Sequence, residues 1–441
     1  MDIRDVVHGV IQIENHELPI LDSHFFQRLR QIRQTGFAEN SYPGSTHNRY
    51  IHSLGALQTI TQTFESIFAQ LKNRSPQAWM RFRALSRFAA MLHDIGHGPL
   101  SHTTEFAMPQ VGQLKVPGQK KNSNRKATHE DYTVKILLDS ELTPILTKAT
   151  APFGFTPLHI ASVIEPHLDP QDNFFTETID GETIDFRPIL HQLISSELDA
   201  DRMDYLRRDS FYAGVTYGDF DFRWVVSNLC AHVKEGRCYL ALKHRALYAF
   251  EDFLLSRFNM FLMVYLHHKT VVYDEMLARY LNDPSCDYQL PSNIEQYLEF
   301  TDAHLYAHLA KSSNPWAKRI IDKTPYRMLL ETHSGIPSSE AAQVQQDRLY
   351  KKVIENLKSK KLDYIATTST GELSKYFGKP EHPIFVRYDN LYSAPSYIPI
   401  QKCTALFTQY PNHRSISRIF VSPEDYSKVA NDGRTETILF E

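Results

Sequence analysis

Apolar residues recur at helical intervals from about residue 20 to about residue 330, and this pattern constrains the fold of the 441-residue chain more than any other feature. After Ser53, apolar residues follow at steps of three, four or one as far as Leu71, which places them on one helix face. Ser75 and Pro76 then supply an N-cap and a first-turn proline for a second amphipathic helix, which ends at His93. We therefore expect a mainly α-helical fold.

Two more helices and a different C-terminal region are expected beyond these. One helix should run from about Pro188 to Arg208, and a very apolar one from about Ala246 to Leu281, its second half deeply buried. The segment Thr332–Glu340 is typical of a connection, and a charged helix should follow it to about Lys361. Short β-like runs come last: IFVRYD, KCTALFTQ, ISRIFVS and TILFE. The predicted organisation is a helical core domain, residues 1–330, and a smaller C-terminal α/β region, residues 331–441.

Composition and charge narrow the class of protein. The chain is 42% hydrophobic and 22% charged, which is typical of a globular protein. Its formal net charge of -3 gives no chain-wide surface for a nucleic acid or a membrane. The four cysteines form no CxxC pair, so neither a disulfide framework nor a thiolate zinc site is expected. Because no signal-peptide pattern or membrane-length apolar stretch occurs, we expect a soluble protein of the reducing cytoplasm.

The densest chemical signal is the stretch MLHDIGHGPLSH, residues 91–102. His93 and Asp94 place an imidazole beside a carboxylate, a combination that suits first-row transition metals. Adjacent His and Asp also occur at ordinary helix ends, where the histidine lies near the last carbonyl groups. Because His97 and His102 follow, and two glycines allow close backbone approach, the metal-site interpretation is the stronger one.

Two other segments carry side chains of the same kind. Arg49 and His52 lie three residues apart and share a helix face, so one can bind a metal while the other contacts a phosphate oxygen. Taken alone, a capped helix start explains this pair slightly better. Asp201, Tyr205 and Asp209 form one helical stripe, and buried acids need partners such as a metal or a sugar hydroxyl. An exposed helix with Asp–Arg ion pairs is the alternative, stronger for Asp209 than for Asp201.

Further candidates have strong structural alternatives. His129 lies in a Thr–Glu pattern that also begins helices. Arg257, Tyr265 and His267 lie on the expected buried helix, where a hydrogen-bonded core histidine is more common than a ligand. The five lysines and arginines of residues 115–126 are better explained by a solvated loop than by phosphate binding.

Together, the segments HNRYIHSLG, HDIGHGPLSH and DADRMDYLRRD resemble the HD superfamily of metal phosphohydrolases, whose ligand order is H…HD…D. The runs VVHGVIQIE, ILDSHFFQRLRQIRQTG and YPGSTHNRYIHSLG resemble its deoxynucleotide triphosphohydrolase branch, and the resemblance extends from about Val6 to about Leu277. It implies an HD-domain helical core that cleaves a dNTP to a deoxynucleoside and inorganic triphosphate, by water attack on the α-phosphorus. The implied cofactor is a divalent transition metal (Mn, Fe, Ni, Co or Zn), with Mg on the substrate phosphates as a further option.

The resemblance also assigns roles to individual residues. The implied metal ligands are His52, His93, Asp94 and Asp201. The implied catalytic cluster is His97, His102, Glu105 and His129, with His102 as first choice of general acid for the leaving 5′-oxygen. The implied substrate contacts are Gln34, Arg49, Arg202, Tyr205, Asp209, Arg257 and Tyr265, the arginines at the phosphates and the others at the deoxyribose.

Four positions depart from the vertebrate members of that branch. Glu105 replaces an aspartate, Arg202 a lysine, Phe261 a histidine and Thr35 a leucine. We therefore expect the base and sugar preference and the phosphate geometry to differ. The metal ligands are complete.

Regulation is a further expectation from the resemblance. Asp22, Gln27 and Arg30 match residues that hold an activating guanine nucleotide between subunits, and Tyr42 matches an aromatic residue there. A plain amphipathic helix explains this segment equally well. By analogy we expect a guanine or deoxynucleotide effector and a homo-dimer or tetramer.

Two other functions stay open. The first is an HD phosphodiesterase or phosphatase acting on another nucleotide, against which the deoxyribose set argues. The second is a nucleotide-sensing or nucleic-acid-binding protein with a vestigial site, against which the four intact ligands argue. The near-neutral charge does not indicate a partner such as single-stranded nucleic acid.

Overall fold

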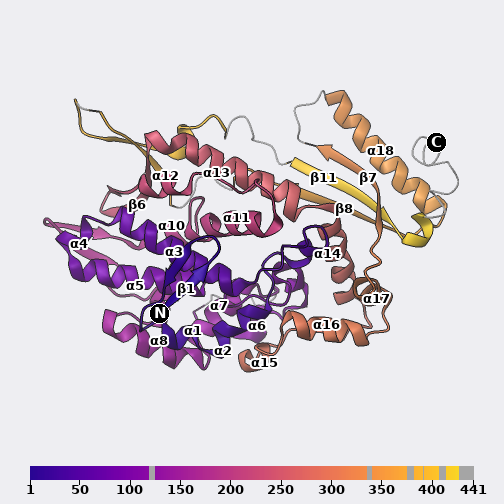
Figure 1. Cartoon of the computed structure of the whole chain (residues 1–441), viewed down its shortest axis with the longest axis horizontal. Coiled ribbons are helices and arrows are strands. Elements are labelled where there is room, and N and C mark those ends of the chain that lie inside the picture. The colour runs from indigo at the N-terminus through magenta and orange to yellow at the C-terminus, as the bar shows by residue number, and fades with distance from the viewer. Residues whose placement is uncertain (119–124, 335–339, 375–381, 391, 407–413, 427–441) are drawn as a thin grey trace.

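The computed structural model describes residues 1–118, 125–334, 340–374, 382–390, 392–406 and 414–426 (Figure 1). The helices are α1 (Leu18–Leu21), α2 (His24–Gln27), α3 (Arg49–Ile67), α4 (Leu71–Arg74), α5 (Pro76–Leu92), α6 (Val111–Leu114), α7 (His129–Leu138), α8 (Leu142–Thr150), α9 (Pro157–Ile164), α10 (Arg187–Ile194), α11 (Ala200–Ala213), α12 (Phe222–Ser227), α13 (Leu247–Met260), α14 (His268–Leu281), α15 (Ile294–Tyr297), α16 (Asp302–Lys311), α17 (Pro315–Ile321) and α18 (Glu340–Ser359). The strands are β1 (Asp2–Asp5), β2 (Gly9–Gln12), β3 (Thr176–Ile179), β4 (Glu182–Asp185), β5 (Leu229–Lys234), β6 (Arg237–Lys243), β7 (Arg327–Ser334), β8 (Tyr364–Gly371), β9 (Phe385–Tyr388), β10 (Ser396–Pro399) and β11 (Arg414–Val421). The prediction of a mainly helical protein with a smaller, sheet-containing C-terminal portion is confirmed.

Helix α3 lies at the centre of the helical core and packs on α5 and α11. It begins at Arg49 because the Asn48 side chain caps it, accepting a hydrogen bond from the Ile51 amide at 3.2 Å. At Gly55, an added Cβ would lie 2.0 Å from the carboxylate of Asp204 on α11, so glycine is required for this close approach. Helix α5 begins at Pro76 as predicted, but the Ser75 hydroxyl donates to Glu177 instead of capping it.

The helix expected from Pro188 to Arg208 is in fact two helices, α10 and α11, separated at Ser195–Asp199. Ser195 is extended, and the Asp199 carboxylate caps α11 by accepting from the Arg202 amide at 2.7 Å. Because the Asp199 side chain bonds to the backbone of α11, it favours a helix break over continuation of α10 through residues 195–199. The break directs the first turn of α11 toward α3.

The helix expected from Ala246 to Leu281 is likewise interrupted. Helix α13 ends at Met260, a π-helical segment η6 spans Phe261–Tyr265, and α14 begins at His268. His267 has an extended backbone and its ring accepts a hydrogen bond from the Lys269 amide, which caps α14. Tyr265 is the last residue of this π-helical turn, and such turns are frequent at functional sites.

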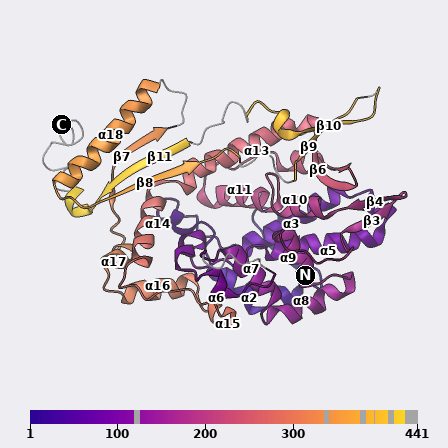
Figure 2. The same cartoon turned by 180° about the vertical axis from the view of Figure 1, so that it is seen from behind.

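The C-terminal strands divide between two sheets. Strand β11 lies between β7 and β8, antiparallel to both, and α18 packs on this sheet through Val353 and Leu357. Figures 1 and 2 both show this layer beyond α14, at one end of the helical core. Strand β9 instead joins the larger sheet by pairing in parallel with β6. The C-terminal region is therefore joined to the core by strand pairing as well as by chain connection.

Several C-terminal predictions are corrected. Thr332–Ser334, expected in a connection, belong to β7. The run KCTALFTQ is no strand in its described part, because its start closes the 3-10 turn η7 (Ile400–Lys402) and no strand pairing follows as far as Leu406. The runs IFVRYD and ISRIFVS contain β9 and β11, and TILFE lies outside the described residues.

None of the described helices is both long enough and apolar enough to cross a membrane.

Candidate active site

Four predicted ligands converge from three helices. His52 comes from α3, His93 and Asp94 follow the last turn of α5, and Asp201 lies in the first turn of α11. The His52 Nε2 atom lies 3.0 Å from Asp201 Oδ1 and 3.4 Å from Asp94 Oδ2. The His93 Nε2 atom lies 3.4 Å from Asp94 Oδ1 and 3.5 Å from Asp201 Oδ1. The ligand atoms of His52, His93 and Asp94 thus all lie within 4.8 Å of one another, and Asp201 lies beside both histidines.

The hydrogen bonds behind the two imidazoles leave their inner nitrogens free for a cation. His93 Nδ1 donates to the Ala90 carbonyl at 2.8 Å, and His52 Nδ1 donates to Asp204 Oδ2 at 2.9 Å. Within the described part of the chain, neither Nε2 atom has a well-aligned hydrogen-bond partner, although both are buried. Buried polar atoms rarely stay unpaired, and a nitrogen and oxygen donor set of this kind fits a divalent transition metal.

Asp204, which sequence reasoning missed, holds the metal-facing imidazole from behind. Its second oxygen lies 2.6 Å from His8 Nε2, and Arg208 donates to both of its oxygens at 2.9 and 3.0 Å. Arg208 also donates to Asp5 at 2.7 Å. Burial works to raise the pKa of Asp204, but Arg208 and the two histidines hold it well below its usual range. The carboxylate therefore stays ionised and fixes the orientation of His52, as outer partners of metal-binding histidines do.

Arg49 contacts the ligand group directly. Its guanidinium donates to Asp94 Oδ2 and, through Nε, to the Ser101 hydroxyl at 2.8 Å. Although burial works against ionisation, Arg49 and His93 hold the pKa of Asp94 well below its usual range. The structure thus places Arg49, which lies on the same helix as His52, against Asp94.

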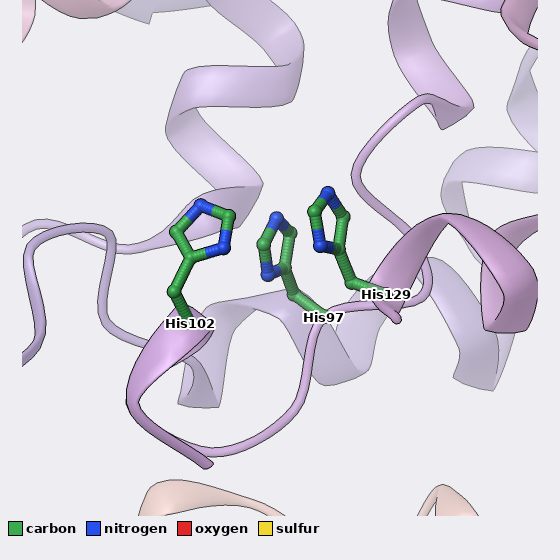
Figure 3. A group of neighbouring side chains, drawn as sticks. All are labelled: His97, His102 and His129. Atoms are coloured by element: carbon green, nitrogen blue, oxygen red, sulfur yellow. The ribbon is translucent and has the colours of Figure 1, made fainter. Parts of the chain in front are cut away.

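Three histidines, His97, His102 and His129, form a second group (Figure 3), which Glu105 joins. The His97 and His129 rings are stacked 3.8 Å apart, and the His102 ring lies edge-on to both at 4.9 Å. His97 Nε2 lies 3.2 Å from Asp94 Oδ1, which joins the two groups. Glu105 Oε1 lies 2.7 Å from His129 Nδ1 and 3.2 Å from His102 Nδ1. All four predicted catalytic side chains are therefore neighbours.

The members of this group differ in exposure and charge. His97 is buried, and its burial together with Arg49 and His129 places its pKa well below the usual range, so it is neutral. The His102 side chain is 67% exposed and can reach a ligand. Burial opposes ionisation of Glu105, but its bonds from His102 and His129 lower its pKa to about 2. Gly96 permits the arrangement, since an added Cβ would lie 2.2 Å from the His129 carbonyl.

The residues predicted at the deoxyribose extend away from the metal ligands. The Tyr205 ring lies 6.5 Å from the His52 ring and 6.5 Å from the Tyr265 ring. The Tyr265 hydroxyl donates to Asp209 at 2.6 Å, and the other Asp209 oxygen lies 2.7 Å from His47 Nε2. His47 was missed by sequence reasoning, because its partner lies 162 positions further along the chain.

Three further residues that the sequence analysis named for the sugar region are Gln34, Thr35 and Phe261. The backbone N–H of Gln34 donates to the His47 carbonyl, which places Gln34 beside the group formed by His47, Asp209 and Tyr265. Thr35 instead directs its hydroxyl to Ser45 at 3.0 Å. The Phe261 ring lies 5.1 Å from the Tyr265 ring, at the start of η6. The Tyr205 and Phe261 rings therefore both lie near the Tyr265 ring.

Two of the three arginines predicted at the phosphates share one carboxylate. The Nη1 atoms of Arg202 and Arg257 each lie 3.1 Å from Glu197 Oε1. Arg202 is partly exposed, whereas Arg257 is 5% exposed. Glu197 lies between α10 and α11, outside every motif that the sequence singled out.

The predicted effector residues gather around Tyr50. The Arg30 guanidinium lies 3.6 Å from the centre of the Tyr50 ring, and Arg30 Nε donates to Gln27 at 2.7 Å. Asp22 ends α1 nearby and acts on the pKa of Tyr50, which burial raises. Tyr42 instead donates its hydroxyl hydrogen to the Met263 carbonyl at 2.7 Å.

Two family models match the chain. One, described as HD domain, covers residues 49–209, and the other, described as HD associated region, covers residues 221–364. The first includes all four converging ligands. The chain is also similar to the uncharacterized protein YwfO of Bacillus subtilis, 31% identical over 63% of this chain and 54% of that protein.

A second relative and a solved structure extend the comparison. The deoxynucleoside triphosphate triphosphohydrolase SAMHD1 homolog of Dictyostelium discoideum is 24% identical over 68% of this chain and 52% of that protein. The chain spans about half the length of these curated relatives. The crystal structure of a hypothetical protein from Aquifex aeolicus superposes with a TM-score of 0.71, covering 97% of this chain and 98% of that one at 24% identity. The fold is therefore shared along nearly the whole chain.

Proposed function

The chain carries an HD domain followed by an HD-associated region, and from this premise we propose that it is a metal-dependent phosphohydrolase that cleaves a dNTP to a deoxynucleoside and inorganic triphosphate. The observation that carries the proposal is the convergence of four ligand side chains around two buried imidazole nitrogens without well-aligned partners among the described residues. The Dictyostelium relative and the tyrosine–aspartate group beside the metal ligands support the choice of substrate.

His52, His93, Asp94 and Asp201 would hold the metal, for which Mn, Fe, Co, Ni and Zn all suit the donors. When bound, it would supply Lewis-acid chemistry that activates water and neutralises charge on the phosphates. Asp204 keeps His52 in the tautomer that presents Nε2 to the cation. A ligating histidine must be neutral, so the bond from His52 Nδ1 to a permanent carboxylate prepares the site.

The phosphate chemistry follows from the groups around Asp94. Arg49 and Arg202 would bind and orient the phosphate oxygens, since guanidinium groups suit multi-donor phosphate contacts. As the bond from the water oxygen to the α-phosphorus forms, the bond from that phosphorus to the 5′-oxygen breaks. The leaving 5′-oxygen then needs a proton. His102 would supply it from Nε2, because its Nδ1 is directed to Glu105 and its side chain is exposed.

The sugar would be recognised by hydrogen-bonding groups that are already fixed. Asp209 is held between the Tyr265 hydroxyl and His47, so its carboxylate has one defined orientation toward a 3′-hydroxyl. Tyr205 and Tyr265 would leave little space for a 2′-hydroxyl. A site built to pair with one hydroxyl rejects an analogue strongly when that pairing is lost.

For regulation, we propose that a guanine or deoxynucleotide effector binds at the group formed by Asp22, Gln27, Arg30 and Tyr50, in a homo-dimer or tetramer. The exposed Arg30 guanidinium over an aromatic ring supports an anionic, ring-containing ligand there.

Product analysis tests the proposed function. Purified protein is incubated with manganese or iron and with each dNTP, alone and in pairs, and the products are separated by ion-pair chromatography. We expect deoxynucleoside and inorganic triphosphate in equal amounts, and neither product from the His93→Ala, Asp94→Ala double variant. Activity only in mixtures would support the effector site. Intact dNTPs together with cleaved monophosphates or cyclic nucleotides would refute the substrate assignment.

A further inference from the structure

Glu197 lies between Arg202 and Arg257, two arginines for which the sequence resemblance implies phosphate contacts. Its side chain is 1% exposed, and one of its oxygens lies 3.1 Å from the guanidinium of Arg202 and 3.1 Å from that of Arg257. Arg202 follows the α11 cap by three residues, whereas Arg257 lies near the end of α13. One carboxylate thus joins two arginines from different helices.

The second Glu197 oxygen is bound by a residue of the C-terminal region. The Ser374 hydroxyl donates to it at 2.9 Å, and Ser374 is fully buried. One residue earlier, the Leu373 carbonyl accepts from Arg257 Nη2 at 3.1 Å. This segment directly follows β8, so the three-stranded sheet reaches the arginines through it.

Electrostatics explains why such a bridge is needed. Two guanidinium groups that contact the same oxygen atom repel each other, and both lose hydration on burial. Glu197 lies against both guanidinium groups, and Asp199 Oδ2 lies 3.6 Å from Arg202 Nε on the other side. Glu197 therefore holds the two arginines together, and Arg202, which is partly exposed, can contact a polyphosphate.

We propose that Glu197 and Ser374 are positioning residues that hold Arg202 and Arg257 together as one phosphate-binding face, so that the C-terminal segment Glu372–Ser374 is a structural part of the substrate site. The identity of the ligand as a nucleoside triphosphate rests on the proposed function above. The positioning itself rests on the contacts of Glu197 with the two arginines and with Ser374.

The test measures phosphate binding without turnover. Inorganic triphosphate in magnesium buffer is titrated calorimetrically into the full chain and into the variants Glu197→Gln and Ser374→Ala. The matched control is Thr370→Ala, an exposed residue of β8 four positions before Ser374. We expect binding to weaken roughly tenfold for Glu197→Gln, which loses a buried charge, and roughly threefold for Ser374→Ala, which loses a neutral hydrogen bond, and to stay unchanged in the control. For dNTP hydrolysis, KM should rise by similar factors while kcat changes less.

Each outcome decides the matter. If Glu197→Gln does not fold, Ser374→Ala alone carries the test. Wild-type affinity in both variants, tighter binding in Glu197→Gln, or no triphosphate binding by the wild-type chain overturns the inference. If triphosphate binds and the variants weaken it while no dNTP is cleaved, the positioning role stands and the proposed function is wrong.

Discussion

At the scale of single residues, hydrogen bonds behind the ligands decide how the candidate metal site works. His52 presents Nε2 inward because its Nδ1 faces Asp204, and Asp204 is held in turn by His8 and Arg208. Burial works to lower the pKa of His52, but Asp201, Asp204 and Asp94 raise it to about 10. A cation of higher charge would replace the proton in this strongly negative surrounding, so metal affinity should increase with pH.

The Asp204→Asn variant tests the role of this outer carboxylate. We expect metal affinity to fall by roughly 10- to 100-fold, because His52 loses the partner that fixes its orientation. Chelator competition followed by metal analysis measures the affinity, and Asp219→Asn, an exposed residue, is the matched control. Circular dichroism checks that the variant is folded. An affinity equal to that of wild type in folded Asp204→Asn would contradict the account.

The residue types of the site could be predicted from sequence, but their supporting partners could not. His52, His93, Asp94 and Asp201 carry metal-binding groups at spacings that local periodicity places on helix faces and ends. Asp204 sits on the same helix as Asp201, yet its partner His52 lies 152 positions away. Such long-range pairs have no local signal, and the same holds for Glu197 with Arg257.

At the scale of elements, the helix breaks set the geometry of the site. Asp199 stops one long helix and begins α11, which directs Asp201 toward α3. The second break contains the η6 turn, which ends at Tyr265, the residue whose hydroxyl donates to Asp209. The serine and aspartate residues before α11 are typical N-cap residues, so they indicate a helix start in the sequence. The π-helical turn has no such signal, because apolar periodicity continues through it.

Asp302, at the start of α16, connects two loops of the site region and yields a prediction for stability. Its oxygens accept from the Leu100 amide at 2.7 Å and from the Arg33 amide at 3.0 Å. Burial raises its pKa to about 6, although both amides act in the other direction. Because the folded-state pKa lies above the ordinary value of 3.8, the native state binds the proton more tightly than the unfolded state. Its contribution to stability is therefore complete below about pH 4 and is lost as pH rises through about 6.

The Asp302→Asn variant should remove this pH dependence. Across the range from about pH 4 to about pH 7, we expect the free energy of unfolding of wild type to lose up to about 3 kcal/mol more than that of the variant. Urea unfolding at fixed temperature measures it, with the exposed Asp322→Asn as control. Parallel curves for wild type and Asp302→Asn would show that this carboxyl group does not titrate abnormally.

At the scale of the whole molecule, two strand pairings and a buried hydrogen bond join the C-terminal region to the rest of the chain. Strand β9 extends the large sheet through β6, β11 completes the sheet that β7 begins, and Ser374 reaches Glu197. The individual strands β9 and β11 could be predicted from their apolar residues. Their partners could not, since strand pairing depends on segments far away in sequence.

Truncation tests how far the core depends on these contacts. A chain that ends after Ser334 keeps β7 but loses its partner β11. It also loses β9, the strand that pairs with β6. We expect its thermal midpoint to fall by roughly 10 °C, because packing worth a few kcal/mol is lost. Differential scanning calorimetry measures the change. An unchanged midpoint would instead support an independent helical domain ending near residue 330, as the proposed division into two regions implies.

We propose that the site formed by His52, His93, Asp94 and Asp201 supports attack of water on the α-phosphorus of a dNTP, and oxygen-18 labelling shows which bond is cleaved. The reaction is run in water enriched in oxygen-18, with the His93→Ala, Asp94→Ala variant as control, and the products are weighed by mass spectrometry. We expect one labelled oxygen in inorganic triphosphate, none in the deoxynucleoside, and no products from the control. Label in the deoxynucleoside, or a labelled nucleoside monophosphate with pyrophosphate, would contradict it.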